Sequence, residues 1–142
     1  MNEESVKVQL TTIHKTEDGE FPISVIADGN YKKIDDMHYI SYSYIDDESK
    51  ALVKSLIKAK TDRVEVIGSG DLAYRMVFDK KGIHISKADA GGLALSIKQV
   101  TNDLSVIEDE GGIIISIDYE LYQGKALMSS CDMKINILRR IQ

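Results

Sequence analysis

The sequence predicts an all-β protein whose strands close, or nearly close, into an antiparallel barrel. Three observations lead to this prediction: apolar and polar residues alternate with period two, turn residues recur about every eight to twelve positions, and almost no segment repeats with the helical period. The result is roughly nine or ten short strands, which is typical of a sandwich or a barrel. We favour the barrel because closure leaves no exposed strand edges.

The first part of the chain reads as extended segments joined by turns. Residues 5–15 alternate between apolar and polar, and residues 17–20 carry turn signals. Residues 21–27 are extended again, although Pro22 has no N–H and must lie at a strand start, an edge or a bulge. We expect a bend or bulge at residues 28–30, because Asp, Gly and Asn tolerate positive φ.

The middle of the chain holds the densest strand signal and the one ambiguous segment. Residues 37–45 are rich in aromatic and β-branched side chains, which favour strands. Residues 51–60 also fit an amphipathic helix capped by Ser49, since apolar pairs recur at the helical spacing. We predict a strand for residues 55–60, because residues 61–67 look like a turn followed by a partner strand.

The second half continues with short strands separated by polar or glycine-rich turns. One predicted strand face carries Leu72, Tyr74, Met76 and Phe78. No linker or change of composition interrupts the pattern, so we expect one domain over residues 1–142. Further strands are predicted at residues 83–87, 93–100, 104–107, 113–122 and 126–138, with turns at residues 68–71, 80–82, 90–92, 101–103, 108–112 and 122–125.

Composition and charge restrict the kind of protein. The chain has 142 residues, a formal net charge of −5 and a single cysteine. An acidic protein repels phosphate backbones, so we expect no nucleic-acid partner. A single cysteine excludes an internal disulfide, and no apolar stretch fits a signal peptide or a membrane span. We therefore expect a cytoplasmic protein without a membrane partner.

No residue pattern in the sequence defines a catalytic or metal site. His14, His38 and His84 share no metal-ligand spacing, and we expect them to be partly exposed residues of strands or turns. Cys131 lies in a strand pattern and reads as a structural thiol. The acidic run at residues 108–110 reads as a solvated turn rather than a calcium loop. We predict no catalytic residue, no metal ligand and no cofactor.

The most informative side chains are the tyrosines and a methionine of two predicted strands. A barrel of about eight or more strands is either filled by side chains or holds one small ligand. Tyrosine suits a ligand site because it offers an apolar ring with a polar tip; the alternative is that these residues only fill the core. Arg75 could reach the interior only if the Tyr74 face pointed outward. The predicted ligand-binding residues, for a small amphipathic or apolar molecule, are Tyr39, Tyr42, Tyr44, Tyr74, Arg75 and Met76.

Two other functions stay open. One is a protein–protein interaction module, such as a homodimer through an apolar strand face around Ile114, with a barrel filled by side chains. The other is a hydrolase or isomerase with its site at the barrel mouth, which needs a titratable pair within hydrogen-bond reach. The absence of a catalytic motif argues against an enzyme without excluding one.

Short motifs run in a fixed order through most of the chain. They comprise residues 29–31, 39–42 and 55–70, Met76 with Phe78, Gly92, Leu93 and Leu95 with Thr101, and residues 119–121 with Gly124. Together they resemble the YwiB-like family of small bacterial proteins of unknown function, which have calycin-like, or lipocalin-like, barrels. The resemblance implies the same fold for this chain but no reaction. Departures at Tyr44, Gly68 and residues 88–91 change polar positions, so a polar site shared by the family would be incomplete here.

Overall fold

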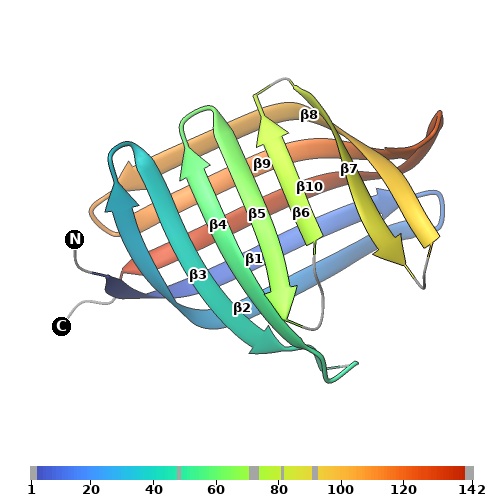
Figure 1. The fold of residues 1–142 in the computed structure, drawn as a ribbon. Coiled ribbons are helices and arrows are strands. Elements are labelled where there is room, and N and C mark those ends of the chain that lie inside the picture. The colour runs from blue at the N-terminus through green and yellow to red at the C-terminus, as the bar shows by residue number, and fades with distance from the viewer. Residues whose placement is uncertain (1–2, 48, 71–73, 81, 91–92, 140–142) are drawn as a thin grey trace.

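The strands of this computed structural model follow one another around a barrel in chain order (Figure 1). The structure describes residues 3–47, 49–70, 74–80, 82–90 and 93–139. Asp71, Leu72, Gly91 and Gly92, which the sequence analysis assigned to turns or a strand, lie outside these residues. The strands are β1 (Glu4–Thr16), β2 (Gly19–Ile34), β3 (Met37–Ile45), β4 (Leu52–Lys60), β5 (Arg63–Gly70), β6 (Tyr74–Asp79), β7 (Ile83–Ala90), β8 (Leu93–Asp109), β9 (Gly112–Gln123) and β10 (Ala126–Arg139).

Strand pairing closes the barrel almost completely. The sheet order is β6-β5-β4-β3-β2-β1-β10-β9-β8-β7, and its ladders are antiparallel. Chain neighbours pair with each other, and the ladder between β1 and β10 joins the first strand to the last. Among the described residues no ladder joins β6 to β7, although the two strands are in contact. The predicted all-β, nearly closed antiparallel barrel is therefore confirmed.

Figure 1 shows a flattened barrel made of two crossing layers. β3, β4, β5 and β6 form the front layer, and β8, β9, β10 and β1 run behind it at a steep angle. β2 bends from the rear layer into the front layer. Because one face of every strand points between the layers, inward and outward side chains alternate along each strand.

Apolar side chains fill the space between the layers. Val8, Ile40, Ile57 and Ile135 are each 0% exposed and belong to one continuous cluster. Burying an isoleucine side chain contributes about 1.5–3 kcal/mol relative to leaving it exposed. This cluster is the main stabilising feature, and it separates the two ends of the barrel from each other.

Two predicted breaks in the strands are absent. β2 runs through the expected bend at residues 28–30, because each of these residues pairs with β1 and the ladder keeps the chain extended. β8 runs through the expected turn at residues 101–103. The register with β9 shifts there, so these polar residues form a β-bulge instead of a turn. The ambiguous segment is strand β4, as predicted. The described chain contains no helix able to span a membrane.

Ion pairs cover the barrel end that carries both termini (Figure 1), which we call the closed end. Arg139 donates a hydrogen bond to Glu4 at 2.9 Å, and the ammonium of Lys33 lies 3.2 Å from a carboxylate oxygen of Glu108. All four side chains are partly exposed, so each pair contributes little to stability. Their effect is to shield the polar groups beneath them from solvent.

Beneath these ion pairs lies a buried hydrogen bond between Tyr31 and His38. The Tyr31 hydroxyl is 2.8 Å from Nδ1 of His38, and the two side chains are 4% and 6% exposed. Burial lowers the pKa of His38, which favours the neutral ring that can accept the phenolic proton. The expectation of a partly exposed histidine is therefore wrong for His38.

Candidate functional site

The opposite end of the barrel, which we call the open end, is where the β1–β2 and β9–β10 hairpins extend past the front layer (Figure 1). The β2–β3 ladder stops at the pair Gly29–Tyr42. Beyond that pair, β2 residues 19–28 pair only with β1. The front and rear layers therefore separate along this part of β2.

The separation leaves inward-facing apolar side chains uncovered. Ile23 pairs with Thr12 and Phe21 with His14, on the same face of β2 as the buried Ala27. Phe21 and Ile23 are nevertheless 50% and 51% exposed, whereas Ala27 is 8% exposed. At the open end, apolar surface that points into the barrel is thus reached by solvent.

The inward face of the rear layer changes from apolar to polar towards this end. Cross-strand pairs place Thr101, Tyr119, Cys131 and His14 in one row over β8, β9, β10 and β1. Ser129 and Gln99 lie on the same inward face, one row closer to the open end, on either side of Leu121. These side chains include no carboxylate, lysine or arginine, so the site offers hydrogen bonds rather than a fixed charge.

Cys131 lies at the centre of this polar group. Its Sγ is 3.2 Å from Nδ1 of His14 and 3.3 Å from Oγ of Ser129. Burial, together with Cys131 beside it, raises the pKa of the Tyr119 phenol well above its ordinary range. Cys131 itself is 2% exposed, but His14 is only partly buried. The imidazole of His14 therefore contacts the buried thiol on one side and is itself partly exposed to solvent at the open end.

Thr12 supplies an uncommitted hydroxyl next to this group. It is 4% exposed, lies between Ile23 and Met133 in its row, and shares the inward face of β1 with His14. Its hydroxyl makes no hydrogen bond within the described residues. Every fully buried side-chain nitrogen or oxygen of the described residues has a hydrogen-bond partner. The Thr12 oxygen has none, so it must be in contact with solvent. It is a free hydrogen-bonding group inside the barrel.

Three of the predicted ligand-binding tyrosines meet on the front layer. Tyr42, Ser55, Gly68 and Tyr74 form one inward row, in which the Ser55 hydroxyl is 2.9 Å from the Tyr74 hydroxyl. The Tyr74 ring lies over Gly68, where a Cβ would overlap it. Burial raises the pKa of Tyr42 to about 12, although a hydrogen bond with Ser55 opposes this.

Tyr44 stacks on this row and borders the gap. Its ring is 6.2 Å from that of Tyr42, with an interplanar angle of 11°. It follows the last β2–β3 pair along β3, so β2 does not cover it. Tyr44, Tyr74 and Met76 are half-buried against the core cluster. The front layer thus contributes aromatic surface to the interior beside the open end.

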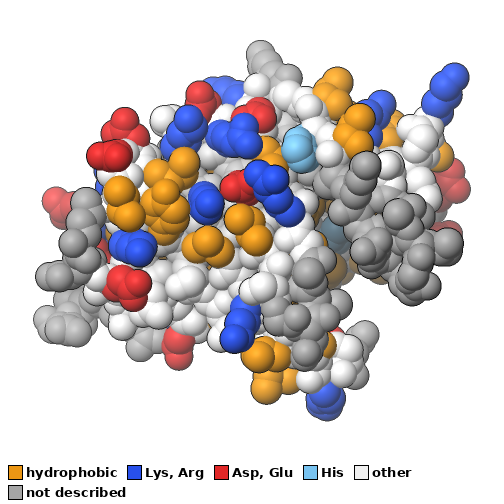
Figure 2. All heavy atoms as spheres, in the orientation of Figure 1, with side chains coloured by type: hydrophobic (Ala, Val, Ile, Leu, Met, Phe, Trp, Pro, Cys, Tyr) orange, Lys and Arg blue, Asp and Glu red, His pale blue; other side chains and the backbone are white. Residues whose placement is uncertain are grey.

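The other two predicted residues lie on the outer face of the front layer. Arg75 is exposed and pairs with Glu65, to which its Nε donates a hydrogen bond at 2.7 Å. Tyr39 pairs with Lys58 and Lys32 across its neighbouring strands, opposite to the inward row. Figure 2 shows this outer surface, where basic and apolar side chains alternate. Because the Tyr74 face points inward, Arg75 cannot reach the interior.

The contact between His14 and Cys131 was not predicted from the sequence. The two residues are separated by 117 positions and lie on β1 and β10, which only the closing ladder brings together. Both inward-facing positions follow from the alternation of their strands, but the register between the strands does not. The expectation that Cys131 is a purely structural thiol therefore overlooked the imidazole beside it.

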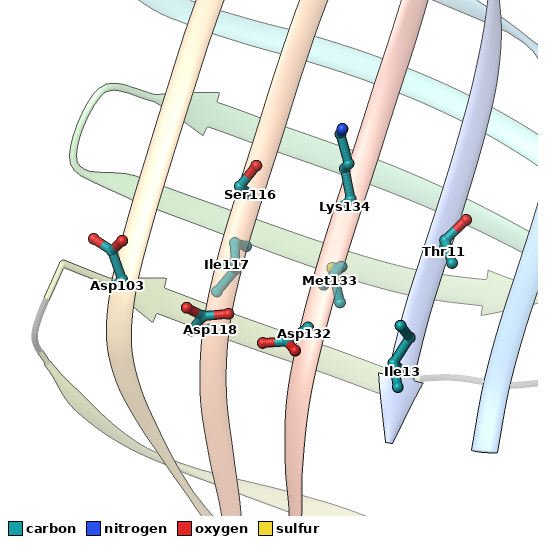
Figure 3. Close-up of a pocket in the computed structure, with 9 residues that line it drawn as sticks. All are labelled: Thr11, Ile13, Asp103, Ser116, Ile117, Asp118, Asp132, Met133 and Lys134. Atoms are coloured by element: carbon teal, nitrogen blue, oxygen red, sulfur yellow. The ribbon is translucent and has the colours of Figure 1, made fainter. Parts of the chain in front are cut away.

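A groove lies outside the barrel, over β8, β9, β10 and β1 (Figure 3). This groove has a volume of about 410 Å³ and carries Asp103, Asp118 and Asp132 side by side on adjacent strands. Ile117 and Met133 also line the groove, but their side chains are buried, so they contribute mainly to its floor. The groove is open to solvent, and among the described residues no three His, Cys, Asp or Glu side chains, these aspartates included, are grouped so that they could hold a metal ion.

Two of these aspartates, Asp118 and Asp132, shift each other's pKa in opposite directions. A hydrogen bond with Asp132, assisted by burial, raises the pKa of Asp118 to about 6, while the same bond and Lys15 lower the pKa of Asp132. The Lys15 ammonium lies 3.2 Å from Asp132. In Figure 3 the two carboxyl groups point towards each other. The mutual hydrogen bond therefore separates the pKa values of two neighbouring carboxyl groups.

An all-β, nearly closed antiparallel barrel with its strands in chain order is a calycin-like barrel. The chain belongs to the family described as domain of unknown function (DUF1934), whose model matches residues 8–135. The crystal structure of ywiB protein from Bacillus subtilis has the same fold, with a TM-score of 0.84 and 22% sequence identity over 98% of this chain and 94% of that one. No curated protein matches the sequence. The resemblance to YwiB-like proteins is confirmed.

Proposed function

We propose that this protein binds a small amphipathic molecule at the open end of the barrel. The observation that carries the proposal is the exposure of Phe21 and Ile23, at 50% and 51%, on the face of β2 that points inward. An apolar side chain turned towards the interior and left in water contributes favourable free energy when a ligand covers it. Pockets for small molecules combine such surface with a few convergent polar groups.

The residues around the opening suit opposite ends of one molecule. Phe21 and Ile23, with Tyr44 across the gap, would contact its apolar part. Thr12, His14 and the groups around Cys131 would hydrogen-bond its polar part. The described side chains of these inward rows include no carboxylate, lysine or arginine, so a strongly charged group would lose hydration without gaining a fixed charge as partner. The ligand class is therefore an apolar compound with an uncharged polar group.

A fluorescence titration with N-phenyl-1-naphthylamine, an uncharged apolar probe, tests the proposal. We expect saturable binding to the wild-type protein. Ile23→Asp should weaken binding of the probe on the order of tenfold to a hundredfold. The variant loses about 1.5–3 kcal/mol of apolar contact and places a carboxylate against the apolar probe.

The matched control is Ile26→Asp. Ile26 lies on the same strand and is 65% exposed, but it pairs with Gln9 on the outer face. This variant should bind the probe as the wild type does. Absence of binding to the wild type, or equal loss in both variants, would contradict the proposal. Location in the cytoplasm and a role without turnover remain predictions that accompany it.

A homodimer is the second candidate. Ile107 and Ile114 pair across β8 and β9 and are 57% and 36% exposed on the outer face. Two adjacent exposed isoleucines are ordinary for a protein surface, however, and smaller than most interfaces require. We therefore give ligand binding precedence.

A further inference from the structure

We propose that Cys131 is a nucleophile activated by His14, and that the open end accepts α,β-unsaturated carbonyl compounds that add to its sulfur. This inference rests on the proposed function, because the same opening must admit the compound. It goes further by naming the reactive atom, the base and the class of ligand.

The geometry around the sulfur carries the inference. Nδ1 of His14 lies 3.2 Å from Sγ of Cys131, which is the separation of a thiol proton shared with an imidazole. The Ser129 hydroxyl is 3.3 Å from the same sulfur and can stabilise a thiolate by donating to it. Two polar groups in contact with one sulfur exceed what packing alone requires of a buried thiol.

Thr12 is an independent observation that points to a ligand. It is a hydroxyl-bearing side chain, 4% exposed, with no hydrogen-bond partner among the described residues, diagonally across from Cys131 in the β1–β10 ladder. A diagonal pair lies roughly 7–8 Å apart between Cα atoms. A carbonyl oxygen on a compound bonded to Cys131 is within the reach of this hydroxyl, which otherwise has only water to bind.

The reaction balances with these groups alone. The thiol proton moves to Nδ1 of His14 as Sγ forms a bond to the β-carbon of the compound. The π electrons of the carbon–carbon double bond move to the α-carbon and carbonyl oxygen as an enolate. The imidazolium then returns the proton to the α-carbon, so that a thiol and an unsaturated carbonyl give one thioether.

A soft metal ion is the competing ligand for a cysteine and a histidine. Stable protein sites use three or four such side chains. The described residues contain no group of three or more metal-ligating side chains, so the pair cannot complete a site by itself. An uncharged carbon electrophile also fits the inward rows at the open end, whose described side chains include no carboxylate to pair with a cation.

Intact mass spectrometry after treatment with N-ethylmaleimide tests the inference. The chain has a single cysteine, so a single adduct identifies its own site. We expect the folded wild type to react at least as fast as the denatured chain, although Cys131 is 2% exposed. His14→Gln should slow the folded reaction roughly tenfold to a hundredfold near pH 7, because the general base is gone. An excess of N-phenyl-1-naphthylamine should also slow it.

His84→Gln is the matched control, since β8 and β9 lie between its strand and β10 in the sheet. It should react at the wild-type rate. The inference is overturned if the folded protein reacts far more slowly than the denatured chain, or if the two histidine variants behave alike. Probe binding without adduct formation would reject the chemistry and leave the proposed function standing. Adduct formation without probe binding would reject the proposed function instead.

Discussion

The side-chain carbonyl of Gln99 accepts a hydrogen bond from the backbone N–H of Val77 across the seam between β6 and the rear layer, at 3.4 Å. Gln99 is 1% exposed and Val77 is 1% exposed. No ladder links β6 to β7 in the described chain, so this side chain takes the place of a missing strand partner. An unpaired buried N–H costs about 1–3 kcal/mol, which makes Gln99 important for closure.

Replacing this amide should weaken the seam. Gln99→Leu keeps the side-chain size but removes the acceptor, and we expect a loss of about 1–3 kcal/mol in the free energy of unfolding. Native-state hydrogen exchange should show faster exchange at the Val77 amide. Gln123→Leu, an exposed substitution at the end of β9, is the control. Equal stability of the two variants would show that the seam closes without Gln99.

The hydrogen bond at the closed end allows a second test. Tyr31→Phe removes the hydroxyl 2.8 Å from Nδ1 of His38 and leaves that nitrogen buried without a partner. We expect a loss of about 1–3 kcal/mol in urea unfolding. The unfolding should be measured at pH 8, because the lowered pKa of His38 keeps its ring neutral at that pH. Tyr122→Phe, at a part-buried hydroxyl that donates a hydrogen bond to Glu120, should change stability by much less.

The aspartate pair predicts a pH dependence with a definite sign. The pKa of Asp118 is about 6 in the folded protein, above the ordinary aspartate value of 3.8. The folded state therefore holds the proton more tightly, and this contribution to stability is present at low pH and lost as pH rises through 6. Because Asp118 is exposed, solvent screening limits the effect to about 1 kcal/mol or less.

Asp118→Asn should remove this dependence. At pH 8 the variant lacks the repulsion between the two ionised carboxylates, so its Tm should exceed that of the wild type. At pH 5, where Asp118 is largely protonated in the wild type, the difference should shrink. Asp18→Asn, in the exposed β1–β2 turn, should leave the pH profile unchanged. A Tm difference that is the same at both pH values would refute the raised pKa of Asp118.

The fold was predictable because its signals are local. Residues 37–45 alternate and are β-branched or aromatic, and each turn signal belongs to a few consecutive residues. The errors arose where a ladder overrides local propensity, as at residues 28–30, which β1 holds extended on one side. Bulges behave similarly, since the polar residues 101–103 only shift the register of a continuous strand.

The candidate site was less predictable because its residues meet through long-range register. The inward positions of Tyr42, Tyr44 and Tyr74 followed from alternation once the face was known. The contact between His14 and Cys131 depends on the β1–β10 ladder, which no local pattern specifies. The exposure of Ile23 depends on where β3 leaves β2, which is a property of the whole barrel.

The most direct test of ligand binding at the open end is a methyl NMR titration with N-phenyl-1-naphthylamine. Ile23 lies at the opening, Ile26 is on the outer face of the same strand, and Ile57 is buried in the core at 0% exposure. We predict saturable shifts for the Ile23 methyl resonances and none beyond background for Ile26 or Ile57. Shifts confined to outer-face methyls, or no saturable shift at Ile23, would contradict the account.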